Sequence, residues 1–332
     1  MKNSVLFLVA IPLLLIACGQ GSGNQQRSVV ATVEKPDLVT PEFNADSAYY
    51  FIEKQVSFGP RVPNTPEHIA CAEYLAATLE RFGADVIVQE AEVRAFDNTR
   101  LNIRNIIGQF QPEKSERLLL FAHWDTRPFA DHDPDPAMRN TPILGANDGG
   151  SGVGVLLEIA RHLQENPTHP GIDIIFFDAE DYGIPDHIHV PYRPDTWCLG
   201  SQYWGQNPHV RNYYARFGIL LDMVGAKDAQ FYREQHSLRF APRLVDHIWN
   251  IAHELGYGAW FNFGIGGLIT DDHVYVYKHL NIPSVNIIQH DPTSPTSFGS
   301  YWHTHADNMD IIDKATLKAV GQTVMEVIYR EK

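Results

Sequence analysis

The sequence predicts an α/β fold, a three-layer α/β/α sandwich with a central, mostly parallel sheet, from three observations. Short, unbroken apolar runs recur along the chain, as expected of strands that are buried on both faces. Segments with helical periodicity lie between or after these runs. Buried strands that alternate with helices require a sheet covered on both sides. The predicted buried strands are residues 118–122, 172–177, 218–221 and 284–288.

Two further strands and a set of helices complete the predicted order. Residues 84–96 and 101–110 are rich in Val and Ile, which favours strands. The helix over residues 67–82 begins next to Pro66 and ends at Gly83, the usual order of start and stop residues. The other predicted helices are residues 46–58, 152–164, 242–255, 272–280 and 314–329.

The first residues are typical of an exported lipoprotein. Lys2 precedes an apolar run over residues 5–16 that is too short to span a bilayer as a mature helix. The sequence LIACG at residues 15–19 resembles a lipobox, which predicts a signal peptide over residues 1–17 and a lipid on Cys18. A chance cysteine after an ordinary signal peptide is the alternative.

The rest of the chain divides into a tether and one domain. Residues 18–41 are rich in small and polar residues without apolar periodicity, which indicates a flexible tether. Residues 42–332 contain no second linker and no internal repeat, so we expect a single α/β domain. The sequence leaves the oligomeric state open.

The net charge limits the expected partners. It is −14 at pH 7, and removal of the signal peptide deletes only Lys2, a positive charge. An acidic protein has no electrostatic attraction to nucleic acid or to an anionic membrane. We therefore expect membrane attachment through the lipid alone, in the cell envelope and facing the periplasm, because a lipobox implies passage across the inner membrane.

Two cysteines, Cys71 and Cys198, remain once Cys18 is assigned. The compartment permits a disulfide between them. Two separate buried thiols are equally compatible with the sequence, because spacing alone does not show whether their Cα atoms approach closely enough.

Acidic and histidine side chains follow the predicted buried strands directly. Strands of a parallel sheet bring their carboxyl ends to one edge, where sites of open α/β sheets collect. A single aspartate at a strand end more often forms a turn or caps a helix. Several such residues at one edge instead predict a zinc site, since zinc takes imidazole and carboxylate ligands. The candidates are His123, Asp148, Asp181, Asp222 and His303.

Glu180 adds a second element to this site. Adjacent residues leave a strand end in different directions, so Asp181 can bind metal while Glu180 stays free. A free carboxylate beside a metal-bound reactive group is a natural general base. A solvated acidic turn is the alternative.

The segments that carry these residues resemble the zinc aminopeptidase superfamily, in family order and across most of the chain after the tether. They are AHWD (122–125), GANDGGSG (145–152), FFDAED (176–181), LLDMVG (220–225) and WHT (302–304). Within the superfamily the chain is more similar to bacterial glutaminyl cyclases of the animal type. The features that favour this branch are TDDH (270–273), DYG (181–183), WCLGS (197–201) and Trp302 directly before His303.

The resemblance implies a zinc-dependent acyltransferase, a glutaminyl-peptide cyclotransferase. Such an enzyme converts the N-terminal glutamine of peptides and proteins to pyroglutamate and releases ammonia. The resemblance places one zinc ion on Asp148, Asp181 and His303. Asp181 stands where the animal enzymes have glutamate, so the geometry between metal and base departs from the family at this position.

The resemblance also implies roles around the metal. Glu180 would carry the proton, and Asp222 and Asp271 would form an acidic, hydrogen-bonded group with it. Trp302 and Trp197 would wall the substrate pocket. His123 would support the site or bind a second metal.

Two other functions remain open. In a two-zinc aminopeptidase, His123 and Asp222 would hold a second ion, Asp148 would bridge the two, and a metal-activated water would attack the peptide. A non-catalytic binding protein on an enzyme fold belongs to a different class. It would be expected to have lost a ligand or the base, and none is missing.

Some polar residues near these motifs are not expected to bind metal. DHDPD at residues 131–135 resembles the start of a calcium loop, but Pro136 and Pro142 occupy the required Gly and Glu positions. We expect a surface loop over the site. Residues near the motifs that are expected to support ligands rather than bind metal are His273, Asp307 and Asn308.

Overall fold

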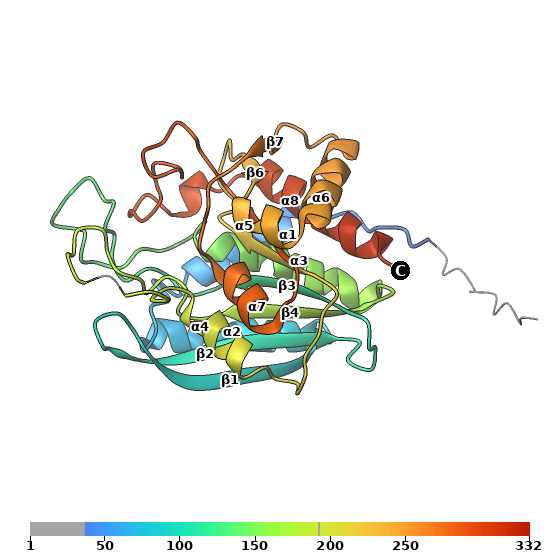
Figure 1. Ribbon diagram of the computed structural model, residues 1–332, viewed down its shortest axis with the longest axis horizontal. Helices are drawn as coiled ribbons and strands as arrows, with labels where there is room; N and C mark the ends of the chain where they lie inside the picture. Colours follow the sequence, from blue (N-terminus) through green and yellow to red (C-terminus); the bar gives the residue numbers. More distant parts are fainter. Residues whose placement is uncertain (1–36, 192) are drawn as a thin grey trace, which may run out of the picture. The chain divides into compact units, whose positions relative to one another are not determined.

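A six-stranded sheet forms the centre of the protein, in the order β1-β2-β4-β3-β5-β8 (Figure 1). The computed structural model describes residues 37–191 and 193–332. The strands are β1 (Asp85–Arg94), β2 (Arg100–Phe110), β3 (Arg117–His123), β4 (Gly171–Phe177), β5 (Gly218–Asp222) and β8 (Ser284–Ile288).

The sheet is mixed, with its parallel part next to an antiparallel edge. β1 and β2 pair antiparallel, and β2 joins the rest of the sheet antiparallel to β4. β4, β3, β5 and β8 run parallel to one another. The carboxyl ends of β4, β3 and β5 therefore lie side by side, as the prediction of a mostly parallel sheet requires.

The inner strands are buried on both faces, which explains their unbroken apolar sequences. In β3, Leu118 and Leu120 belong to the largest of the three hydrophobic clusters found among the described residues. Their neighbours Leu119 and Phe121 belong to a second cluster, together with Trp204. Successive side chains of a strand point to opposite faces, so each face receives an apolar row.

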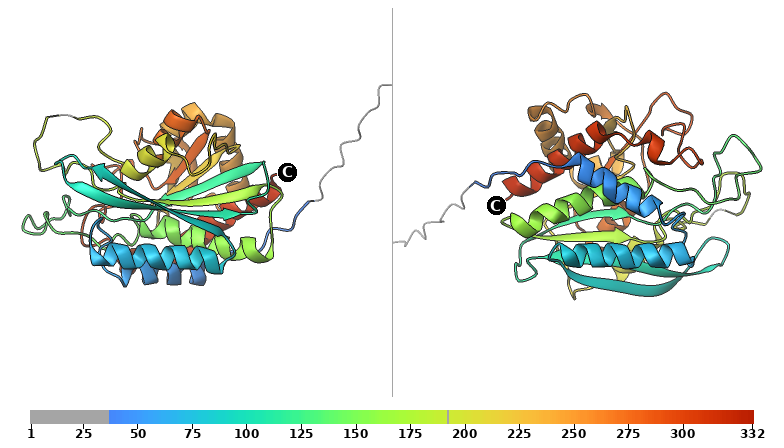
Figure 2. Two further views of the ribbon diagram at one scale, coloured as in Figure 1. Left: turned by 90° about the horizontal axis from the view of Figure 1, so that it is seen from below. Right: turned by 180° about the vertical axis from the view of Figure 1, so that it is seen from behind.

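Helices cover both faces, which confirms the three-layer sandwich (Figure 2). α1, α2 and α3 lie on one side of the sheet, α8 packs against α1 and α3, and α6 packs against α8. α4 and α7 pack against each other on the opposite side. The bounds are α1 (Ala45–Val56), α2 (Pro66–Arg81), α3 (Gly150–Glu165), α4 (Leu199–Gln206), α6 (Pro242–Glu254), α7 (Asp272–Leu280) and α8 (Lys314–Arg330).

All predicted helices and strands are present, with ends that differ by two residues or fewer. The sequence did not predict the shorter elements. α4 contains Gly200 and Gly205, which weaken its helical pattern, and it forms where it packs on α7. The other elements that were missed are α5 (Gln235–Phe240), β6 (Phe231–Arg233), β7 (Phe261–Ile265) and the 3₁₀ helix η1 (Met309–Ile311).

The compact unit begins at Asp37, inside the segment 18–41 that the sequence predicts as a tether. Asp37 pairs with Lys332 at 2.7 Å, and the Pro41 carbonyl accepts a hydrogen bond from Gln322 of α8 at 3.1 Å. The predicted signal peptide and Cys18 lie outside the described residues.

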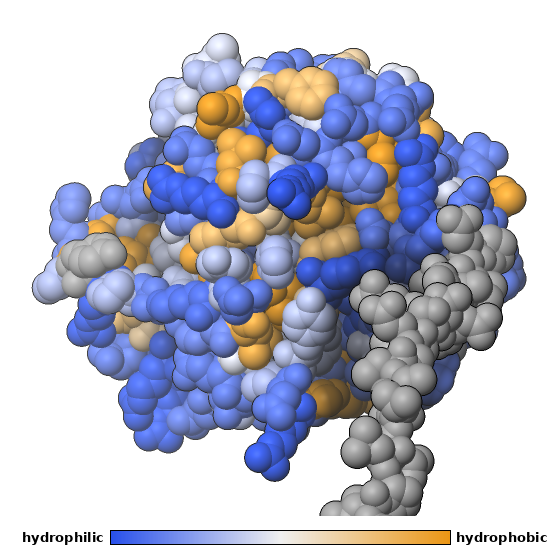
Figure 3. All heavy atoms as spheres, turned by 45° about the vertical axis from the view of Figure 1, so that its right-hand side comes forward, coloured by the Kyte–Doolittle hydropathy of each residue, from blue (hydrophilic) through white to orange (hydrophobic). Residues whose placement is uncertain are grey.

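Cys71 and Cys198 are separate, buried thiols. Cys71 lies on α2 and Cys198 caps α4, and these helices cover opposite faces of the sheet. Within the described residues, none of the helices is long and apolar enough to cross a membrane. On the face in Figure 3, hydrophobic residues form small patches among hydrophilic ones.

Candidate active site and metal centre

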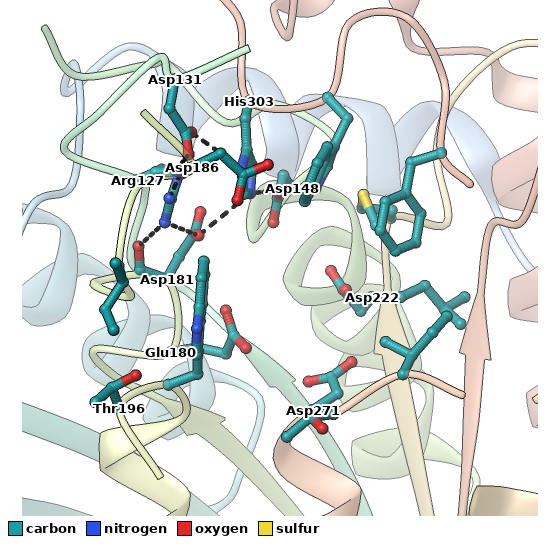
Figure 4. Close-up of a pocket in the computed structure, with 18 of the residues that line it drawn as sticks. Arg127, Asp131, Asp148, Glu180, Asp181, Asp186, Thr196, Asp222, Asp271 and His303 are labelled. Carbon is teal, nitrogen blue, oxygen red and sulfur yellow. Dashed lines mark hydrogen bonds and ion pairs between the residues drawn. The ribbon is translucent and has the colours of Figure 1, made fainter. Parts of the chain in front are cut away.

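A pocket of about 450 Å³ opens at the carboxyl ends of the parallel strands. Figure 4 shows its acidic side chains converging from several loops. His123, at the end of β3, is buried and contacts Asp148 and Asp222 of the pocket lining. The predicted site residues that line the pocket are Asp148, Glu180, Asp181, Trp197, Asp222, Asp271, Trp302 and His303.

Asp148, Asp181 and His303 come together as predicted. Their nearest ligand atoms all lie within 4.8 Å of one another, and all three residues are buried. His303 Nε2 is 3.4 Å from Asp181 Oδ1 and 3.7 Å from Asp148 Oδ2. Asp181 Oδ2 has no hydrogen-bond partner although it is buried. A buried carboxylate oxygen without a partner beside an imidazole and a second carboxylate fits a zinc ion, which takes such ligands.

A strained turn after β4 separates the two neighbouring acids. Ala179 has φ 51°, a left-handed conformation that costs a residue with a Cβ about 1–3 kcal/mol. The buried carboxylate of Asp125 holds this turn, because it accepts hydrogen bonds from the backbone N–H groups of Glu180 (3.0 Å) and Asp181 (3.2 Å). Asp181 can therefore face His303 while Glu180 faces the pocket (Figure 4).

Asp307 holds the loop that carries the candidate ligand Asp148 in the same way, through backbone hydrogen bonds. Its carboxylate accepts hydrogen bonds from the N–H groups of Asn147 at 2.7 Å and Asp148 at 3.0 Å. Burial, with repulsion from Asp148, raises the pKa of Asp307 to about 7. Its position agrees with the expectation that it supports a ligand.

Glu180 lies beside Asp271 and Cys198 at the pocket wall. The nearest ligand atoms of these three residues lie within 4.8 Å of one another, and the Cys198 thiol donates to Glu180 Oε1 at 3.1 Å. Burial raises the pKa of Glu180 well above its ordinary value, and repulsion from Asp271 adds to the rise. Such a carboxyl group takes up and releases a proton nearer neutral pH than an exposed glutamate does.

His123 connects the metal group to Asp222. Its Nε2 atom is 3.0 Å from Asp148 Oδ1 and 3.3 Å from Asp222 Oδ1. Burial raises the pKa of Asp222 to about 7, against the hydrogen bond from His123. Ligand atoms of His123, Asp148 and Asp222 lie within 4.8 Å of one another, so they form a second group of metal-ligating residues that shares Asp148 with the first.

Two tryptophans near the His303 ring line the pocket. The Trp302 ring stacks on the imidazole with centroids 3.6 Å apart. The Trp197 ring lies nearly parallel to the imidazole, 6.3 Å away and at an interplanar angle of 11°. Both residues line the pocket, as predicted.

Residues 105–328 match Peptidase family M28. The chain belongs to this family. A crystal structure of Tannerella forsythia glutaminyl cyclase is 59% identical, covers 88% of this chain and 100% of that chain, and has a TM-score of 0.87. A Zn-dependent exopeptidase from Parabacteroides distasonis is 60% identical at the same coverage and TM-score. The Bos taurus glutaminyl-peptide cyclotransferase is 26% identical over 310 residues, 82% of this chain and 78% of the relative.

The site of this M28 protein also contains a buried arginine that the sequence did not predict. Arg127 donates to both carboxylate oxygens of Asp131 at 2.7 and 2.8 Å. It also donates to the Asp181 carbonyl at 3.0 Å and to Asp181 Oδ1 at 3.2 Å. Its guanidinium lies over the Trp197 ring, 4.7 Å from the centroid. Arg127 thus holds one candidate ligand and one wall of the pocket.

The segment expected to form a surface loop over the site is exposed at residues 134–138, but Asp131 at its start lines the pocket. The residue is buried, and its Oδ1 atom lies 3.2 Å from His303 Nδ1, the nitrogen that faces away from the candidate metal ligands. A carboxylate at this position orients the imidazole and raises its basicity as a ligand. No pattern around residues 131–135 indicated this contact, which depends on a partner far away in the sequence.

The other two residues expected to support ligands lie elsewhere. His273 contacts Glu234 at 3.1 Å. Asn308 caps η1 through a hydrogen bond from the Asp310 N–H group at 2.8 Å.

Proposed function

We propose that this protein is a glutaminyl-peptide cyclotransferase, an aminoacyltransferase that cyclises the N-terminal glutamine of peptides and proteins. The observation that carries the proposal is the carboxyl group of Glu180, which is not one of the candidate zinc ligands. It faces the pocket beside Asp271, next to three buried zinc-type ligands. The similarity to bacterial and animal glutaminyl cyclases over most of the chain supports the same reaction.

Asp148, Asp181 and His303 would hold a single zinc ion. When bound there, zinc supplies Lewis-acid polarisation of the substrate's γ-carbonyl group. The protein side of the reaction is then binding, orientation and proton transfer.

Glu180 moves the proton. The α-amine of the substrate forms a bond to its own side-chain carbonyl carbon, and the bond from that carbon to the amide nitrogen breaks. Glu180 accepts the proton that the amine loses and returns it to the departing nitrogen, which leaves as ammonia. A group that acts first as base and then as acid needs a pKa near the working pH, which agrees with the raised pKa of Glu180.

Trp197 and Trp302 select the conformer and limit water. The attack is intramolecular, so holding the chain of the glutamine in one geometry supplies much of the rate. Two aromatic rings near His303 suit this, and their apolar surface keeps water from competing with the amine.

Mass spectrometry of peptide products tests the proposal. Purified protein is incubated with a mixed pool of peptides that begin with Gln, Leu or Ala. We expect loss of one ammonia from the Gln-initiated peptides alone, abolished by a chelator and restored by zinc. Loss of whole N-terminal residues would contradict the proposal.

That contrary outcome corresponds to a second candidate, a two-zinc aminopeptidase. The observation in its favour is the second ligand group of His123, Asp148 and Asp222, which shares Asp148 with the first. The zinc content of active protein distinguishes the two: one ion per chain agrees with the cyclase and two with the aminopeptidase.

We also propose export and lipid anchoring through Cys18, with the enzyme facing the periplasm and acting on peptide substrates there. The basis is the lipobox-like sequence LIACG and the polar segment after it. Metabolic labelling with a fatty acid should mark the wild type and leave Cys18→Ser unlabelled. The variant should move from the membrane fraction to the soluble one. Labelling of the variant would contradict the anchor.

A further inference from the structure

Glu234 is a buried carboxylate outside the pocket, at the N-terminus of α5. Its oxygens accept hydrogen bonds from the N–H groups of His236 (2.7 Å) and Ser237 (2.6 Å). Three further donors reach it from side chains and from another loop. An N-cap of a short helix needs only one or two partners, so the remaining contacts call for another explanation.

Two of the remaining contacts go to the segment that carries Asp271. Glu234 Oε1 accepts from the Ile269 N–H group at 3.1 Å. Glu234 Oε2 accepts from His273 Nε2, also at 3.1 Å. These partners lie two residues before and two residues after Asp271, so Glu234 holds the backbone before it and a side chain after it.

A second connection reaches the Asp271 carboxylate itself. The Ser237 hydroxyl donates to Glu234 Oε2 at 2.8 Å and accepts from the Asn286 N–H group at 2.9 Å. The Asn286 side chain then donates to Asp271 Oδ2 at 2.6 Å. Both the backbone around Asp271 and the partner of its carboxylate are therefore tied to Glu234.

The charge of Glu234 strengthens these contacts. Burial opposes ionisation, but the hydrogen bond and the charge of His273 and the two backbone donors hold the pKa at about 2. Hydrogen bonds to an ionised acceptor are about twice as strong as neutral ones. Glu234 also makes no hydrogen bond to the candidate zinc ligands Asp148, Asp181 and His303 among the described residues.

We infer that Glu234 is a positioning residue that fixes Asp271 against Glu180. The inference rests on the proposed function, in which the Glu180 carboxyl group transfers the proton beside Asp271. Weakening the hydrogen bonds of Glu234 would let the Asp271 carboxylate move relative to Glu180. The candidate metal ligands and the two tryptophans would stay in place. The effect should appear in the rate of the chemical step and not in substrate or zinc binding.

The test compares Glu234→Gln with a matched control, Glu158→Gln. Glu158 is also buried, has a pKa held at about 2, and binds Arg161 and His162 on α3, away from Asp271. We expect Glu234→Gln to lower kcat by about 10- to 100-fold, with KM and zinc affinity within twofold of wild type. The control should lose a similar amount in Tm and keep kcat. An unchanged kcat in folded Glu234→Gln would overturn the inference.

Ser237→Ala provides a second variant that keeps the buried charge. It removes the hydroxyl between Glu234 and Asn286 and should lower kcat by a smaller factor, about threefold, again at constant KM. If Glu234→Gln does not fold, an unchanged kcat in Ser237→Ala overturns the inference by itself.

The wild type separates this inference from the proposed function. If it hydrolyses peptides and does not cyclise glutamine, the proposed function fails. The kcat of the variants is then measured for peptide hydrolysis. A lower kcat at constant KM supports the role of Glu234, and an unchanged kcat overturns it.

Discussion

Glu180 and Asp181 are neighbours in the chain but belong to different parts of the site. Asp181 faces His303, and Glu180 faces the pocket and Asp271. The left-handed turn at Ala179 and the two hydrogen bonds to Asp125 make this separation possible. Ala179 therefore separates a candidate metal ligand from the proposed proton carrier.

Replacing Glu180 by Gln should remove proton transfer and leave the metal group intact. We expect kcat to fall by about 10²- to 10⁴-fold, because a positioned general base contributes a factor of that size. Zinc content should not change, as measured by atomic absorption. Glu73→Gln, at an exposed position on α2, is the control. A rate near that of wild type would show that another group carries the proton.

Arg127 holds several parts of the site in place. It binds Asp131 and Asp181, and its guanidinium lies against the Trp197 ring. Arg127→Met should lower the unfolding free energy by about 3–5 kcal/mol, because it leaves buried carboxylates without their partner. It should also weaken zinc binding by about 10- to 100-fold, since Asp131 would no longer orient His303. Chelator competition measures the affinity.

Arg117→Met is the matched control for Arg127. Arg117 also pairs with a buried aspartate, Asp173, but at the start of β3, the end away from His123. We expect a comparable loss of stability with unchanged zinc affinity. Equal zinc affinities in the two variants would contradict the role of Arg127 at the metal centre.

At the scale of elements, α1 and α3 are joined by a buried charge. Glu158 of α3 accepts hydrogen bonds from the Asn44 N–H group, just before α1, and from Arg161. Burial opposes its ionisation, but Arg161 and His162 hold its pKa at about 2. A pKa below that of the unfolded chain means that the ionised form stabilises the fold above about pH 4.5. This contribution is lost as the pH falls toward 2.

Glu158→Gln should therefore be less stable than wild type at neutral pH, by about 2 kcal/mol. The difference should shrink as the pH falls below about 4.5, which urea unfolding at several pH values measures. Glu92→Gln removes an exposed ion pair with Arg100 and should change stability by less than about 1 kcal/mol at any pH. A difference in stability between Glu158→Gln and wild type that stays constant with pH would contradict the lowered pKa of Glu158.

At the scale of the whole molecule, residues 37–44 belong to the folded unit. Phe43 is buried, its N–H group donates to Gln322 at 2.8 Å, and its carbonyl accepts from Lys318. These contacts join the start of the described chain to α8.

A chain that begins at Asp37 should keep the Tm and activity of the longer protein. A chain that begins at Ala45 loses Phe43 from the core, which should cost about 3–5 kcal/mol. Thermal unfolding followed by circular dichroism measures the difference. Equal stability of the two chains would show that residues 37–44 contribute nothing.

The sequence by itself determined the order of the main strands and helices, the three-layer sandwich and five candidate metal ligands at one edge of the sheet. The narrower group of Asp148, Asp181 and His303 came from the family resemblance. Apolar runs and helical periodicity are local patterns, and the sheet places the ends of parallel strands at one edge. The family followed from short motifs at those same strand ends. The prediction was weakest for short elements such as α4, whose glycines weaken the local signal.

The tertiary structure alone decided what holds the site together. Arg127 contacts Asp181 across 54 positions of the chain, and Asp131 contacts His303 across the fold. Glu234 reaches the segment around Asp271 in the same way. Each of these residues has an ordinary local sequence, and its role depends on which distant partner burial brings within hydrogen-bond distance. No pattern within a few residues of the chain records such a partner.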